Sequence, residues 1–477
     1  MLHYAPLVLD SSSLLDSKKL IREKIVPWEG LARAGVISAD QANLIKVLET
    51  QNHDSKRTTV LGSQQMYART LLNLLSKLDV DARDDVLKCV LVLLNDLLVD
   101  AQAELFADAL LELSSVDVAL PYTPFVKHLD NTDPLIKTLS FYNVTVLLSK
   151  AAKVGNGAHS ETLIKLFSVV CLKQFIGNTQ DSNVQSIGVQ LLQELLVNKP
   201  YRVVFQEHNL ATNAKTLVRL IDTLAKQPNS VNLQLLYNTL LTVWILSFSP
   251  LLNKVLVHSF PSIVGSLLTI AKEGIKLKVV RVAVSTARNF VSFTVSLAEQ
   301  FSVVKLLLFH DGLNVVKTIQ TRKFALESSD EELAGDLAYL NEALSEVVTT
   351  KLTSLDAYLV ELENPDLLSW ASPTHKSEDF WRENAGKFRE NSFALVRRMM
   401  DILAAEDTGS TAPARVILLN DLQFLIRNIG TDLVNFINTE KDSQYKMMVM
   451  GFLENSDGDN ELKYEALRTI QYLVGHA

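Results

Sequence analysis

Apolar residues recur at intervals of three and four along almost the whole chain, which places them on one side of an α-helix. The clearest runs are Val86, Val90, Leu93, Leu94 and Leu97, then Leu333, Leu337, Leu340 and Leu344. Strict alternation of apolar and polar residues, which is typical of a half-buried strand, is hard to find. The pattern therefore predicts an all-α protein.

Helix starts are marked by a serine with a glutamine or glutamate three positions later. In such a capping box the two residues satisfy each other's backbone amides. Ser38 with Gln41, and Ser329 with Glu332, fit this pattern. Residues 131–134 and 226–230 contain the Asn, Asp and Pro that are typical of turns, so we expect them to connect helices.

Similar Leu-rich helices return at regular intervals. Leu94, Leu147, Leu192, Leu241 and Ala287 occupy comparable positions, at steps of 53, 45, 49 and 46 residues. HEAT and armadillo units repeat every 40–47 residues or so, and such units must stack to bury their apolar sides. Near the end, residues 419–425 align with residues 464–470 at an offset of 45. Chance self-alignment of a Leu-rich chain is the alternative, but the sequence favours an armadillo/HEAT-like superhelix with a smaller C-terminal helical-repeat domain.

The pattern changes near residue 350. Residues 366–373 and the pair Phe380-Trp381 form an aromatic, proline-containing stretch unlike the Leu-rich repeats. We therefore predict an N-terminal armadillo/HEAT-like domain over residues 1–350 and a C-terminal helical domain over residues 351–477. Large rings can fix a non-repetitive helix junction, so Trp370 and Trp381 are expected to pack inside the second domain.

Composition excludes several classes of protein. With 48% apolar and 21% charged residues among 477, the chain can bury a large core, so disorder is excluded as its main state. The net charge of −8 disfavours a nucleic-acid binder, because phosphate neutralisation supplies most of the affinity in such proteins. Two cysteines cannot form a disulfide framework, which indicates a reducing compartment.

Targeting and membrane signals are weak. Residues 1–10 have no basic region before their apolar stretch, so we do not expect a signal peptide. Residues 227–253 carry no charge and are long enough to span a bilayer, but polar residues and Pro250 interrupt them. Their apolar positions step at three and four, as in a helix buried among other helices: Leu233, Leu236, Leu240, Val243 and Leu246.

The search for chemistry is mostly negative. The chain lacks the short motifs that cradle phosphates, activate a serine or bind zinc. Its nine histidines, from His3 to His476, are widely spaced. The acidic residues 457–461 lack the glycine and glutamate of a calcium loop, so we expect a turn whose Asp459 caps the next helix. We predict no catalytic, metal-binding or cofactor-binding residues.

The densest cluster of basic residues lies within residues 272–288. It consists of Lys272, Lys276, Lys278, Arg281 and Arg288. No aromatic platform accompanies it, so a solvated or groove-lining helix face is favoured over a nucleic-acid site.

Several strings, in order along the chain, resemble the family of H subunits of the vacuolar-type proton ATPase (V-ATPase). They are residues 26–38, 233–248, 353–362, 368–373, 384–388 and 461–467. The most specific is Trp370-x-x-Pro373 followed by Phe380-Trp381. The polar residues 53–65 depart from the pattern, and loop variation explains this. The match covers the whole chain.

The resemblance implies a non-catalytic regulatory subunit of a proton pump. Such a subunit is cytoplasmic and lies on the cytosolic face of the vacuolar membrane and of other acidic organelles. Its membrane association is indirect, through the complex. Its expected partners are the peripheral stalk of the E and G subunits, the cytosolic domain of the pump's a-subunit, and the catalytic sector once that sector is detached. It bridges the ATP-hydrolysing and membrane sectors, and it inhibits hydrolysis by the detached sector. No cofactor and no nucleic acid are expected.

The resemblance also suggests where inhibition occurs. Residues 405–413 contain no apolar residue larger than alanine or proline, so the core cannot hold them and we expect a projecting loop. An ordinary variable turn is the alternative. In the family, the loop at this place contacts the detached catalytic sector. The candidate inhibitory-contact residues are Asp407, Thr408, Gly409, Ser410 and Thr411.

Two other classes of function stay open. A general armadillo adaptor, such as a nuclear-import or trafficking scaffold, would want Trp and Asn pairs along successive inner helices. Only Trp244 lies in a repeat helix of the N-terminal domain, which counts against it. An enzyme whose site is assembled from distant residues is the second alternative.

Overall fold

Helices make up every regular element of the part of the chain that the computed structural model describes. That part comprises residues 5–78, 83–155, 159–171, 174–208, 210–322, 330–350, 354–370, 372–405, 412–455 and 459–475. The prediction of an all-α protein is confirmed. The chain divides into two compact units, Met1–Val303 with Asn314–Leu340, and Val304–Leu313 with Asn341–Ala477.

Three helices contribute to both units: α18 (Leu297–Phe309), α19 (Gly312–Gln320) and α21 (Glu331–Thr350). The division at residue 350 that the sequence suggests stays a prediction. The helices before them belong to the first unit: α1 (Ser12–Arg22), α2 (Trp28–Arg33), α3 (Ala39–Glu49), α4 (His53–Leu61), α5 (Gln64–Lys77), α6 (Asp84–Leu98), α7 (Glu104–Glu112), α8 (Thr123–Val126), α9 (Pro134–Lys153), α10 (Ser160–Cys171), α11 (Ser182–Leu196), α12 (Lys199–Glu207), α13 (Leu210–Ala225), α14 (Leu233–Leu246), α15 (Pro250–Ser259), α16 (Ser262–Glu273) and α17 (Leu277–Ser292).

Local chemistry sets the helix starts. Ser38 and Gln41 form the predicted capping box at the start of α3. Asp133 caps α9 by accepting from the backbone N–H groups of Leu135 and Ile136, at 2.8 and 3.1 Å. Ser329 lies outside the described residues, and the side chain of Asp330 caps α21 instead.

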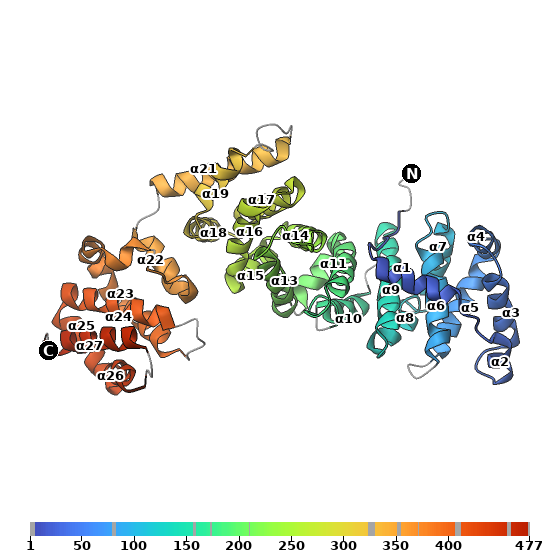
Figure 1. Ribbon diagram of the computed structural model, residues 1–477, viewed down its shortest axis with the longest axis horizontal. Coiled ribbons are helices and arrows are strands. Elements are labelled where there is room, and N and C mark those ends of the chain that lie inside the picture. Colours follow the sequence, from blue (N-terminus) through green and yellow to red (C-terminus); the bar gives the residue numbers. More distant parts are fainter. Residues whose placement is uncertain are drawn as a thin grey trace. The chain divides into compact units, whose positions relative to one another are not determined.

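Long helices pack side by side, one after another, through the first unit. In chain order α6, α9, α11, α14 and α17 each contact the next (Figure 1). α9 is buried over most of its length because helices cover it on several sides. Since each helix buries its apolar side against its neighbours, the unit is an armadillo/HEAT-like repeat stack, as the sequence predicts.

The uncharged segment at residues 227–253 is not one helix. Helix α14 ends at Leu246 with Ser247 as its C-cap, and a second helix, α15, begins at Pro250. Leu236, Leu240 and Val243 of α14 are almost completely buried. Within the described part of the chain no single helix is both long and apolar enough to cross a bilayer. α15 and α16 meet that test only as a pair, bent by 94° at their junction.

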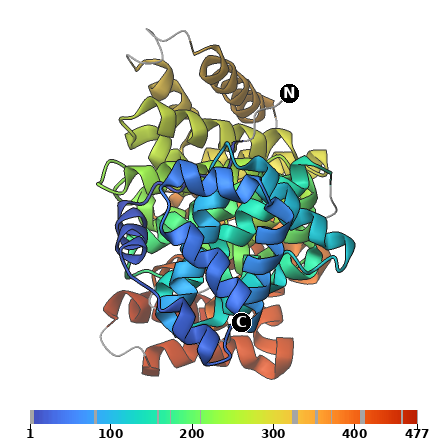
Figure 2. The same cartoon turned by 90° about the vertical axis from the view of Figure 1, so that its right-hand side faces the viewer.

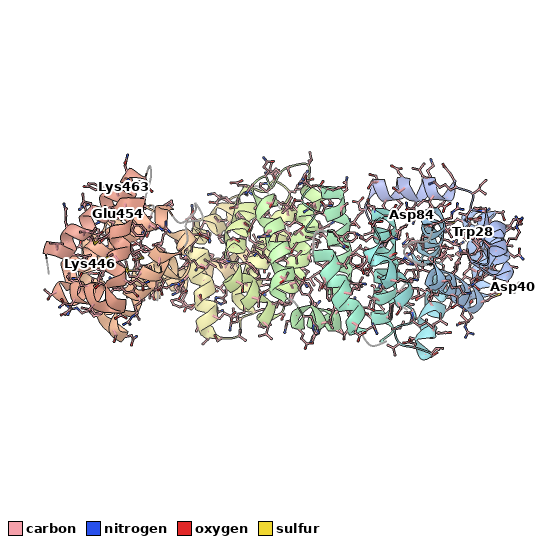
Figure 3. The ribbon with its side chains drawn as sticks, turned by 90° about the horizontal axis from the view of Figure 1, so that it is seen from below. Trp28, Asp40, Asp84, Lys446, Glu454 and Lys463 are labelled. Atoms are coloured by element: carbon pink, nitrogen blue, oxygen red, sulfur yellow. The ribbon has the colours of Figure 1, made fainter. Side chains whose placement is uncertain are left out.

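The string at residues 26–38 forms α2 and the turn into α3. Trp28 is 2% exposed and lies among the N-terminal helices, which face the viewer in blue in Figure 2; Figure 3 labels it. Gly35 follows α2 with φ of +73°, a left-handed conformation that a residue with a side chain adopts only with strain. The string therefore ends one helix sharply and buries its tryptophan.

The second unit is built around an aromatic core. Beyond α21 its helices are α22 (Ser354–Glu363), α23 (Glu378–Ala404), α24 (Ala412–Ile429), α25 (Thr431–Thr439), α26 (Gln444–Asn455) and α27 (Asn460–Gly475). Trp381 is completely buried, which confirms its predicted packing role. Trp370 is only partly buried, at the edge of the same core. As predicted, Asp459 caps α27, by accepting from the backbone N–H of Leu462 at 3.0 Å.

Candidate functional site: a helix face that holds an extended segment

The N-terminal residues 5–11 run as an extended segment across α9 and α11. The hydroxyl of Tyr142, in the middle of α9, accepts from the backbone N–H of Leu9 at 3.1 Å and donates to the carbonyl of Leu7 at 2.7 Å. Burial raises the pKa of Tyr142 to about 12, so this hydroxyl stays protonated and able to donate. We call the side of α6, α9 and α11 that carries residues 5–11 and α1 the inner face.

A glutamine on the next helix holds the same segment by its backbone. The side-chain carbonyl of Gln190, on α11, accepts from the N–H of Asp10 at 2.9 Å, and its amide group donates back to the Asp10 carbonyl at 3.4 Å. Lys153, at the end of α9, donates to the carbonyl of Ala5 at 3.3 Å. Because these contacts use main-chain atoms, the inner face can hold an extended polypeptide with little regard to its side chains.

Asparagines continue this arrangement under α1. Asn95 of α6 accepts from the ammonium of Lys18 at 2.6 Å and donates to Asn143 of α9 at 2.8 Å. Asn143 in turn donates to the carbonyl of Leu91 at 3.0 Å. These amides are buried and hydrogen-bonded, so they fix the spacing between α6 and α9 and the position of α1 on α6.

An ion pair fastens the far end of α1. Arg22 binds both carboxylate oxygens of Asp96, at 2.7 and 2.8 Å, and Lys18 approaches the same carboxylate at 2.8 Å. Burial acts to raise the pKa of Asp96, but hydrogen bonds from Arg22 and Lys18 outweigh it and hold that pKa below its usual range. Two cations on one carboxylate thus secure α1 on α6.

Side-chain amides share one position in successive repeats, on the three helices of the inner face and on α14. Asn95, Asn143, Gln190 and Asn238 are 48, 47 and 48 residues apart. Sequence reasoning missed them because it followed only the leucines of the repeat. An amide recurring at the repeat interval within apolar helices was the signal available.

The segment can be tested through Gln190. Replacing Gln190 with alanine removes both contacts to Asp10, which together contribute about 1–2 kcal/mol. We expect backbone amide exchange in residues 5–11 to quicken about tenfold, as measured by hydrogen exchange and mass spectrometry. Gln193→Ala, on the same helix, is the control and should leave the exchange unchanged. Equal rates in wild type and Gln190→Ala would show that Gln190 does not hold the segment.

Two side chains of the basic cluster on α16 and α17 lie over aromatic rings. The ammonium of Lys278 lies 4.4 Å from the ring centre of Tyr237, and the guanidinium of Arg288 lies 5.1 Å from that of Tyr339. The expectation that no aromatic platform accompanies this cluster is therefore wrong. The rings come from α14 and α21, roughly 40 to 50 residues away along the chain, so they are not visible as a local motif.

The candidate inhibitory loop belongs to a stretch between α23 and α24 in the sequence. Asp407, Thr408, Gly409, Ser410 and Thr411 all lie outside the described residues. The helices on either side end at Ala404 and begin at Ala412. The role of the loop remains a prediction.

The second unit contains a buried histidine between two acids. Nδ1 of His375 lies 2.9 Å from Asp421, and its Nε2 lies 2.9 Å from Glu361. Tyr358 donates to Asp421 at 2.9 Å. His375 and Asp421 are 0% exposed and Glu361 is 2% exposed, so no substrate can reach them in this structure. The cluster resembles a catalytic arrangement in composition, but its burial assigns it to stabilising the fold.

Among the described residues no group of three or more His, Cys, Asp or Glu side chains is arranged to hold a metal ion. The candidate site is the inner face, where side chains hold the backbone of residues 5–11.

Known proteins match this chain over nearly its whole length. Two family models, both described as the H subunit of V-ATPase, match residues 12–344 and 351–477. A relative from Drosophila melanogaster, named as the H subunit of a V-type proton ATPase, is 27% identical over 464 residues, which are 96% of this chain and 88% of the relative. A relative of the same name from Dictyostelium discoideum is 24% identical over 461 residues, 96% of this chain and 93% of the relative.

A solved structure is also similar. It is described as "A conserved phosphorylation switch controls the interaction between cadherin and beta-catenin in vitro and in vivo". It is 13% identical, covers 97% of both chains and has a TM-score of 0.37.

Proposed function

The chain belongs to the V-ATPase H-subunit family, and on that premise we propose that it is a non-catalytic regulatory subunit of the vacuolar proton pump. In this role it bridges the ATP-hydrolysing and membrane sectors and is needed for coupled activity. It also inhibits ATP hydrolysis by the catalytic sector after that sector detaches. It acts in the cytoplasm, on the cytosolic face of the vacuolar membrane and of other acidic organelles.

The inner face is the observation that carries this proposal. It already holds an extended segment by main-chain contacts from Tyr142 and Gln190. A protein that joins sectors without chemistry of its own needs such a polypeptide-binding surface. We assign the first unit to the peripheral stalk of the E and G subunits, and the second unit to the cytosolic domain of the a-subunit or to the detached catalytic sector. Switching between the latter two requires only a difference in affinity between the two states of the pump.

Three measurements on the full chain test the proposal. The purified protein alone should hydrolyse no ATP. Added to the detached catalytic sector it should lower ATP hydrolysis, and it should bind a purified pair of E and G subunits. Hydrolysis by the protein alone would indicate an enzyme. Absence of both inhibition and stalk binding would favour a general armadillo adaptor, which the recurring inner-face amides also fit.

The inhibitory contact is a separate prediction. Replacing residues 407–411 with alanines should relieve inhibition of the detached catalytic sector, because these residues are expected to project toward it. Melting temperature and stalk binding should not change, since no core residue is altered. The control is alanine at residues 456–458, which follow α26 in the sequence. Full inhibition by a folded 407–411 variant would place the contact elsewhere.

A further inference from the structure

The inner face continues beyond the N-terminal segment onto α14. Asn238 occupies the place of Gln190 one repeat later, but it accepts from Gln234 of its own helix, at 3.1 Å. Around it, side chains at intervals of three and four remain partly accessible along one side of α14 and just past its end: Tyr237, Leu241 and Trp244 on the helix, and Phe248 beyond it. Phe248 is 44% exposed. With Lys278 and Arg281 of α17, these residues form what we call the aromatic–basic strip.

The side chains of the strip are held in place. Trp244 donates its indole N–H to the hydroxyl of Ser285 at 3.0 Å, and Phe248 meets the Trp244 ring edge-on at 4.9 Å. Lys278 donates to the side-chain carbonyl of Gln234 at 3.0 Å while it lies over Tyr237. A ligand would therefore meet an ordered surface and lose little free energy to the immobilisation of side chains.

The positive charge at one end of the strip is not balanced. Within the described residues Lys278 has no acidic partner, nor have Lys272 and Lys276, which precede it in the chain, although the chain as a whole carries a net charge of −8. Further along α17 the situation differs. Arg281 lies 3.5 Å from Asp330 and also pairs with Glu332, and Arg288 lies 3.6 Å from Asp336. Two arginines of α17 thus already pair with carboxylates of residues 330–336.

One of the chain's own segments shows which side chains α17 binds. Residues 330–340, which pair with Arg281 and Arg288, combine leucines and a tyrosine with acidic residues. This segment is apolar and acidic, whereas the strip is apolar and basic.

We propose that the aromatic–basic strip binds an acidic, partly apolar segment of the peripheral stalk. Its carboxylates would pair with Lys278 and its neighbours, and its aliphatic side chains would cover Leu241, Trp244 and Phe248. This inference rests on the proposed stalk-binding function and gives that function a surface and a partner chemistry. Charge complementarity and continuity with the face that already holds residues 5–11 both support it.

The test uses the full chain and a purified pair of E and G subunits. Lys278→Glu reverses one charge of the strip at an exposed position, so the fold should be unaffected. We expect it to weaken stalk binding about tenfold, and we expect wild-type affinity to fall as salt rises, more steeply than that of the variant. Lys254→Glu, at an exposed position on α15 of the same unit, makes the same change in net charge and should alter affinity less than about twofold. Equal melting temperatures of both variants and wild type verify folding.

Other outcomes would overturn the inference. If the wild type binds but Lys278→Glu and Lys254→Glu have equal effects, the stalk binds elsewhere and the proposed function still stands. If Lys278→Glu instead changes the sedimentation of the chain alone, the strip contacts a second copy. If the wild type does not bind the stalk pair, the proposed stalk binding fails and the inference fails with it.

Discussion

Replacing Trp381 with alanine should lower the free energy of unfolding of the second unit by about 3–5 kcal/mol. Trp381 is 0% exposed and sits at the centre of an aromatic cluster. Its ring meets Phe380 at 4.9 Å and Tyr358 at 5.1 Å, both nearly perpendicular, and stacks on Phe424 at 6.0 Å. Truncation removes these contacts and leaves a cavity that rigid helices cannot close.

The measurement is chemical denaturation of the full chain, followed by circular dichroism. Trp370→Ala is the matched control, because this ring is only partly buried at the edge of the same core and should cost less. Trp381→Phe should be the milder change at position 381, since the indole N–H has no hydrogen-bond partner within the described structure and phenylalanine keeps most of the ring. A Trp381→Ala protein within 1 kcal/mol or so of wild type would contradict the packing role.

Replacing His375 with alanine should cost a similar amount, about 3–5 kcal/mol, for an electrostatic reason. The imidazole lies between Asp421 and Glu361, both almost completely buried. Without it, two carboxylates remain buried with no cation between them. Burial alone already raises the pKa of Asp421, so we expect Asp421 to take up a proton in the variant.

The same cluster makes stability depend on pH. Burial acts to lower the pKa of His375, but hydrogen bonds and attraction from Asp421 and Glu361 outweigh it and raise the pKa to about 9. A histidine whose pKa is raised in the folded state contributes stability that is full below about pH 6.5 and is lost as pH rises through 9 or so. Unfolding measured at pH 6, 8 and 10 or thereabouts should show this loss in wild type.

Two variants complete the experiment. His375→Ala should be less stable at every pH and should lack the decline between about pH 6.5 and 9. His53→Ala, whose side chain is 61% exposed, should retain wild-type stability and the decline. An unchanged decline in His375→Ala would assign it to another group.

Much of the fold could be predicted because its determinants are local. Helical periodicity follows from backbone geometry, and a capping box needs only residues three positions apart, so Ser38 and Gln41 could be identified from the sequence. The repeat interval also survives in the sequence, because each unit must present an apolar side to the next. The buried character of α14 followed from the spacing of its apolar residues.

The site depended on which residues of different repeats meet, and that is decided by how the helices stack. Leu9 reaches Tyr142 and Asp10 reaches Gln190 across 133 and 180 residues of chain. Glu361, His375 and Asp421 come from separate segments, so no local sequence motif predicts that they meet. By itself the sequence determined the helices, the repeat and the family resemblance. The tertiary structure alone decided that amides line one face, that rings lie beside the basic cluster, and that the histidine is sealed between two acids, because each of these contacts forms only when distant helices pack.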